Sequence, residues 1–151
     1  MEEILKTMLR TVGTVSVLAF AGALASCATM SNLMGGGGQR VTLSGANQVP
    51  PVNTNASGTG TVTVTADRNV SAKINVTGMT ATAAHIHEGA AGSNGPVIVP
   101  FTKTGDNQFS APEGAKMTEA QYAAYKAGKT YVNVHSAKNP GGEVRAQLKG
   151  E

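Results

Sequence analysis

The chain has 151 residues, 40% hydrophobic and 14% charged, which is an ordinary length and composition for one globular domain. Its 12 basic and 9 acidic residues give a net charge of +3, and the basic residues are scattered without interleaved aromatics, which excludes a nucleic-acid-binding footprint. Only 4% of the residues are aromatic while 19 are glycine, so an all-β domain with many turns is favoured over a helical bundle.

The first 26 residues have the pattern of an export signal. A weakly basic head precedes an apolar run at residues 12–24, which has the length of a signal peptide's apolar part and is too short for a comfortable membrane span. The letters LASC that end at Cys27 resemble the bacterial lipobox, in which the cysteine becomes the first mature residue and carries the lipid. Cys27 is the only cysteine, so we expect lipidation there and no intrachain disulfide; a plain secretory signal cleaved nearby is the alternative.

A tether and one folded domain are expected after this signal. Residues 27–38 end in four glycines and should behave as flexible coil, which leaves residues 39–151 for the domain. Ala28 follows the cysteine in place of the aspartate associated with inner-membrane retention. We therefore expect a bacterial envelope protein held by lipid in the outer membrane and facing the periplasm.

Short alternating segments with turn signals between them fill the expected domain. The strands that this pattern predicts cover residues 39–44, 58–65, 70–76, 84–88, 97–101, 107–110, 130–136 and 143–149. Thr118 and Gln121 form a capping-box pattern at the start of one short helix, Glu119–Lys126, and Gly128 is placed to end it. Asn94 and Gly95 are expected only to set a tight turn. The pattern as a whole predicts an antiparallel β-sandwich.

All three histidines lie in two alternating segments with the letters AHIHEG and, downstream, YVNVH. Side chains two apart on a strand point the same way, so His85 and His87 share a face, and His135 lies on the polar side of the second segment. If the two strands are close, the three imidazoles converge on one metal ion, with copper favoured by affinity order and zinc as the alternative. Otherwise the histidines are exposed or hydrogen-bonded residues of the sheet.

Four stretches in chain order resemble the CHRD family, which was first named in chordin and is widespread in bacterial exported proteins. They are VTLSGANQVPP from residue 41, AHIHEG with GSNGPV from residue 84, YVNVH from residue 131 and PGGEVRAQL from residue 140. The resemblance spans roughly residues 40–149. It implies a β-sandwich outside the cytoplasm and no settled biochemical activity; in chordin the context is the binding of secreted growth factors.

The letters HIHE from His85 are also similar to the copper-binding strand of copper-zinc superoxide dismutases. His135, with Arg145 shortly after a glycine-rich turn, is similar to the late copper histidine and the anion-guiding arginine of those enzymes. This second resemblance implies a Greek-key sandwich with copper on its outer face, under loops. Three of the four copper positions have a match, and the zinc-loop histidines and the disulfide have none.

Three further residues have two interpretations each. Glu88 either orients a histidine ring or is solvated. Arg145 is expected to pair with Glu143 or another nearby carboxylate, in preference to guiding a substrate anion. Met79 is expected in the core, in preference to acting as a soft ligand for reduced copper.

Three functions follow from these patterns. The first is a lipid-anchored periplasmic domain that binds or stores a metal ion, copper foremost. The second is a copper enzyme similar to superoxide dismutase, and the sequence leaves open whether the protein is an enzyme at all. The third is a structural or adhesive module that binds a protein or polysaccharide through its loops.

Overall fold

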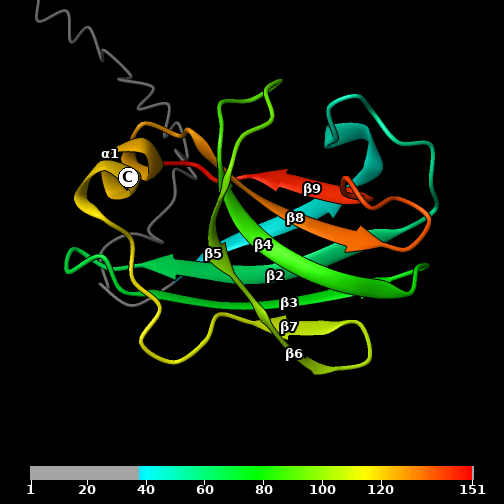
Figure 1. Ribbon diagram of the computed structural model, residues 1–151, viewed down its shortest axis with the longest axis horizontal. Helices are drawn as coiled ribbons and strands as arrows, with labels where there is room; N and C mark the ends of the chain where they lie inside the picture. The colour runs from blue at the N-terminus through cyan, green and yellow to red at the C-terminus, as the bar shows by residue number, and fades with distance from the viewer. Residues whose placement is uncertain (1–37, 151) are drawn as a thin grey trace, which may run out of the picture. The chain divides into compact units, whose positions relative to one another are not determined.

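The computed structural model describes residues 38–150 (Figure 1). Residues 39–147 contain nine strands, one short 3-10 helix and one α-helix. In chain order these are β1 (Gln39–Ser44), η1 (Gly45–Asn47), β2 (Ser57–Val64), β3 (Val70–Thr77), β4 (Ala81–Glu88), β5 (Val97–Pro100), β6 (Thr102–Gly105), β7 (Gln108–Ser110), α1 (Glu119–Lys126), β8 (Thr130–Ser136) and β9 (Val144–Gln147).

All strand pairings are antiparallel, and the strands form one hydrogen-bonded sheet in the order β5-β4-β8-β9-β1-β2-β3-β7-β6. The sheet almost closes on itself, because its two edge strands, β5 and β6, follow one another in the chain with one residue between them. Phe101 joins β5 to β6 and donates its N–H to the carbonyl of Ala84. The expected all-β antiparallel fold is confirmed, although a single curved sheet supplies the two layers expected of a sandwich.

Alternating side chains explain where the core lies. In β3, the residues from Val70 to Val76 alternate strictly between buried and exposed positions, as the Thr/Val pattern of this hairpin predicts. The same alternation turns Ile86, Val132 and Val134 inward, and each is fully buried. Inward positions of different strands therefore share one hydrophobic core.

The predicted helix is confirmed with its bounds. The Thr118 hydroxyl accepts a hydrogen bond from the Gln121 N–H at 3.2 Å, and the Gln121 side-chain oxygen accepts one from the Thr118 N–H at 2.8 Å. Gly128 follows the helix with φ of +69°, a left-handed conformation that suits glycine. Tyr125 is buried and fixes the helix to the core.

The structure departs from the predicted strands most clearly at three places. β4 begins at Ala81, three residues before the predicted start at residue 84. Thr102–Gly105 forms β6, which the sequence did not predict because its side chains are mostly exposed and do not alternate. The last strand, β9, is shorter than the predicted 143–149, although the Leu148 N–H still donates to the carbonyl of Thr130, in register with the pairing of β8 and β9.

The predicted signal, the lipidation site Cys27 and all of the predicted tether except Gly38 lie outside the described residues. Among residues 38–150, no helix has the length and hydropathy needed to cross a membrane.

Candidate metal centre

The two histidine-bearing segments lie side by side as neighbouring strands. β4 and β8 pair with His85 opposite Asn133, His87 opposite Tyr131 and Ala83 opposite His135. Because the intervening apolar residues point into the core, all three histidines project from the outer face of the sheet. The two strands are about fifty residues apart in the sequence, so this pairing brings His135 diagonally next to His85.

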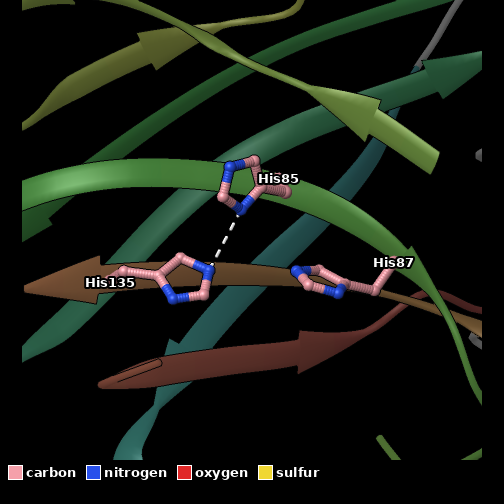
Figure 2. Close-up of side chains that lie close together, drawn as sticks. All are labelled: His85, His87 and His135. Atoms are coloured by element: carbon pink, nitrogen blue, oxygen red, sulfur yellow. Dashed lines mark hydrogen bonds between the residues drawn. The ribbon is translucent and has the colours of Figure 1, made fainter. Parts of the chain in front are cut away.

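Figure 2 shows the three rings gathered above β4 and β8. Nδ1 of His85 lies 3.0 Å from Nε2 of His135, and one nitrogen from each of the three rings lies within 4.8 Å of the other two. The ring centroids are 4.9 Å apart for His85 and His135, 5.5 Å for His85 and His87, and 5.9 Å for His87 and His135. This is the convergence expected from the sequence.

Backbone carbonyls fix the orientation of two of the rings. Nδ1 of His87 lies 2.9 Å from the carbonyl oxygen of Gly95, and Nδ1 of His135 lies 2.9 Å from that of Pro140. A carbonyl only accepts hydrogen bonds, so both Nδ1 atoms carry the proton and both Nε2 atoms present a lone pair. This is the tautomer that a metal-binding imidazole needs.

His85 completes the arrangement as a donor. Nε2 of His135 has only a lone pair to offer, so the hydrogen bond between the two rings requires a proton on Nδ1 of His85. For an ion to be held through Nδ1 of His85, this proton would have to move to Nε2 of the same ring or leave. Ion and proton therefore compete for one nitrogen.

The inward nitrogen of His87 has no partner. His87 is only 8% exposed, and its Nε2 is one of two buried side-chain polar atoms without a hydrogen bond among the described residues; the other is Oγ1 of Thr130. An unsatisfied buried polar atom costs about 1–3 kcal/mol. A cation at the centre of the three rings would satisfy it.

The spacing of the nitrogens fits a transition-metal ion. Imidazole nitrogens lie about 2.0–2.1 Å from such an ion, which places neighbouring ligand atoms about 3.3 Å apart in a tetrahedral site. The observed nitrogens all lie within 4.8 Å of one another, so the rings would have to draw closer around an ion to reach this spacing. The group contains only histidine, with no carboxylate or thiolate from residues 38–150, and this donor set suits copper or zinc.

The surroundings of His85 and His87 favour the neutral form of each ring. Burial, followed by the charges of His135 and His87, lowers the pKa of His85 to about 4. Burial also lowers the pKa of His87; the hydrogen bond to Gly95 opposes this, and the charges of His135 and Arg145 add to it. Neutral imidazole is the form that binds metal, so the centre needs little deprotonation before binding.

Arg145 is buried beside the centre and does not form the expected carboxylate pair. It is 1% exposed, and its guanidinium carbon lies 3.5 Å from the centroid of the Tyr131 ring. Its N–H groups donate to four neutral acceptors: the carbonyls of Ala90 and Ser93 and the side-chain oxygens of Asn94 and Gln147. The expected pairing with Glu143 is therefore wrong, because Glu143 accepts instead from Thr54 and Ser136.

The loop at residues 89–96 does more than make the expected turn. Asn94 donates to the carbonyl of Val49 at 2.6 Å and accepts from Arg145, while Gly95 orients His87 and donates its N–H to the Tyr131 hydroxyl at 3.1 Å. The prediction that Asn94 and Gly95 only set a turn is wrong. The signal for their role was the position of this polar loop directly after the His-x-His strand.

Asn133 is a residue beside the histidines to which the sequence pattern assigned no role. It lies on β8 opposite His85, is 2% exposed, accepts from Gln48 at 2.7 Å and donates to the carbonyl of Gly141 at 3.3 Å. It thus fastens two loops beside the histidines. Its position two residues before His135, on the same face, was the available signal.

Glu88 and Met79 lie apart from the three ring nitrogens. Glu88 ends β4 on the side opposite to His85 and His87, and the ring nitrogens that were candidates for its carboxylate bond to carbonyls. Met79 packs against the hydrophobic core, as expected.

Comparison with known proteins gives one match. The family model of the CHRD domain matches residues 39–148, which contain every element of the fold and all three histidines. No curated protein and no solved structure matches the chain. Because the match covers well over half of the sequence and agrees with the stretches that resembled this family, the chain belongs to the CHRD domain family.

Proposed function

We propose that this protein is a lipid-anchored, extracytoplasmic CHRD-domain protein that binds a transition-metal ion, copper foremost, through His85, His87 and His135. The observation that carries this is the unpartnered, buried Nε2 of His87, which points to a centre where two other imidazole nitrogens converge. The fixed tautomers of His87 and His135 and the lowered pKa of His85 support the same conclusion. Among divalent ions, copper binds nitrogen sites more tightly than zinc does, so zinc is the alternative ion.

Binding or storage is proposed in preference to catalysis. A dismutase-like enzyme needs a positively charged side chain that an incoming anion can reach. Arg145 is buried, and its N–H groups donate to the loop at residues 89–96. The third function, a structural or adhesive module, leaves the orphan nitrogen of His87 unexplained.

Calorimetric titration of the purified protein with Cu(II), and separately with Zn(II), tests metal binding. We expect one ion per chain, with the copper complex the tighter. Absence of heat with both ions, together with unchanged thermal stability, would contradict the proposal and favour the structural module. A dismutase assay on the copper-loaded protein is expected to show no activity above that of free copper.

The proposed anchor rests on Cys27 and its lipobox-like context. We expect labelled palmitate to be incorporated into the protein in a bacterial host and the protein to fractionate with the outer membrane. Cys27→Ala should abolish the label. Label that persists in this variant would exclude Cys27 as the attachment site.

Elemental analysis of protein isolated from the cell envelope would identify its native metal ion.

A further inference from the structure

One buried cation, the guanidinium of Arg145, lies next to the histidine centre, and no carboxylate among residues 38–150 is hydrogen-bonded to it. The guanidinium of Arg145 has only neutral acceptors among its partners in the described part of the chain, namely two backbone carbonyls and two side-chain amides. Burying a charge is costly unless it is paired and well hydrogen-bonded. The Arg145 N–H groups have hydrogen-bond acceptors in the loop, but none of these acceptors carries a negative charge. The positive charge therefore raises the electrostatic potential at neighbouring groups.

Tyr131 connects this charge to the centre. β8 lies between β4 and β9, and on β8 the Tyr131 position faces His87 on one side and Gln147 on the other. The Tyr131 ring stacks on the His87 ring with a centroid distance of 4.9 Å and an interplanar angle of 10°, and Arg145 lies over the Tyr131 ring at 3.5 Å. Guanidinium, phenol and imidazole thus form one continuous stack ending at a proposed ligand.

The environment of the centre transmits this charge efficiently. The donor set is three imidazoles with no carboxylate from residues 38–150, and Tyr131 and Arg145 are both 1% exposed. A buried, water-poor path weakens charge interactions less than solvent does.

We propose that Arg145 sets the oxidation-state preference of the histidine centre and favours Cu(I) over Cu(II). This rests on the copper binding proposed above. Repulsion from a fixed positive charge is twice as large for a divalent ion as for a monovalent one. The Arg145 charge therefore weakens Cu(II) binding more than Cu(I) binding, by the repulsion energy of two unit charges. A unit charge about 10 Å away, at an effective dielectric constant of about 20, changes the ratio of the two affinities about tenfold.

Competition titrations measure this ratio directly. Cu(I) affinity is determined anaerobically against bicinchoninate, and Cu(II) affinity against nitrilotriacetate, for the wild-type protein and for three variants. Arg145→Gln removes the charge, and Arg145→Lys keeps the charge but loses the forked hydrogen bonds. Arg40→Gln is the matched control, because Arg40 lines the same surface hollow as Arg145 and is exposed.

In Arg145→Gln, the Cu(I)-to-Cu(II) affinity ratio should fall about tenfold, which corresponds to a reduction potential lower by about 59 mV. Arg145→Lys should retain most of the wild-type ratio, and Arg40→Gln should match the wild type. An unchanged ratio in a folded Arg145→Gln protein would overturn the inference, as would equal changes in the Gln and Lys variants, since loop geometry would then be responsible.

Failure of the proposed function looks different, because wild-type protein would bind neither ion. If circular dichroism shows that Arg145→Gln does not fold, the wild-type potential decides. We expect it to lie above that of the aqueous Cu(II)/Cu(I) couple, and a value below that couple would refute the preference for Cu(I).

Discussion

Two backbone carbonyls decide which ring nitrogen of His87 and of His135 faces the centre. Gly95 and Pro140 accept the Nδ1 protons of His87 and His135, so each ring is held in its binding tautomer by a group that cannot titrate. Only the His85 proton stands in the way of an ion. The role that the sequence suggested for Glu88 is thus performed by loop backbone.

Alanine in place of each histidine tests the shared centre. His85→Ala, His87→Ala and His135→Ala should each weaken copper affinity at least about a hundredfold, because second-shell changes alone cost about 10–100-fold. Thr82→Ala, an exposed position on β4, is the control and should bind like the wild type. Calorimetry measures all four, and a loss confined to one or two of the histidines would contradict a common site.

The depressed pKa of His85 predicts acid sensitivity in metal-stripped protein. The unfolded ring titrates near 6.5 and the folded one at about 4, so between these values the unfolded chain binds more protons. The stability that the neutral ring contributes is complete above about pH 6.5 and is lost as the pH falls towards 4.

Urea denaturation at pH 7.5 and pH 4.5 checks the contribution of His85. Between these two pH values, the free energy of unfolding should fall more in the wild type than in His85→Gln.

Glu143 adds acid sensitivity of its own. Burial alone would raise the Glu143 pKa, but hydrogen bonds from Ser136, Thr54 and Asn139 lower it below its usual value. Because this contribution is common to both proteins, it cancels in the comparison. Equal losses in the two proteins would exclude His85 as the cause.

At the scale of elements, the register between β4 and β8 is what makes the site. A shift of one residue would turn Ile86 and Val134 outward and the histidines into the core, so the apolar residues specify the register that also assembles the centre. The 89–96 loop then covers this face, held by Arg145 and Tyr131.

Gly95→Ala tests the fit of this loop. A Cβ at Gly95 would overlap the carbonyl oxygen of Glu88, so the loop must move and its carbonyl must leave His87. We expect a loss of about 2 kcal/mol or more in the free energy of unfolding, and weaker copper binding. Gly141→Ala is the control, since a Cβ there meets nothing within 4 Å. If the two variants have the same free energy of unfolding and the same copper affinity, the loop accommodates a Cβ at Gly95 and the expected strain is absent.

For the whole molecule, an ion that ties β4 to β8 should stabilise the native state. Copper at a hundred times its dissociation constant adds about 2.7 kcal/mol, which raises the melting temperature of a domain of this size by about 10 °C. Scanning calorimetry with and without copper measures this shift. A protein lacking all three histidines should show no shift, and an equal rise in that protein would reveal binding elsewhere.

Much of the fold could be read from local pattern, because alternation and capping act over a few residues. The hairpin of β2 and β3 and the helix with its Thr118 and Gln121 capping box were predictable in this way. β6 was not, since its pairing with β7 supplies the strand conformation that its own exposed side chains do not signal.

The sequence by itself determined the all-β class, the strand faces and the three candidate ligands, because each depends on residue types at short spacings. Only the tertiary structure decided that His135 meets His85, that Gly95 and Pro140 orient the rings, and that Arg145 stacks on Tyr131. The contact between His85 and His135 joins strands 50 residues apart in the sequence, and which strands become neighbours depends on the packing of the entire core, which no local pattern contains.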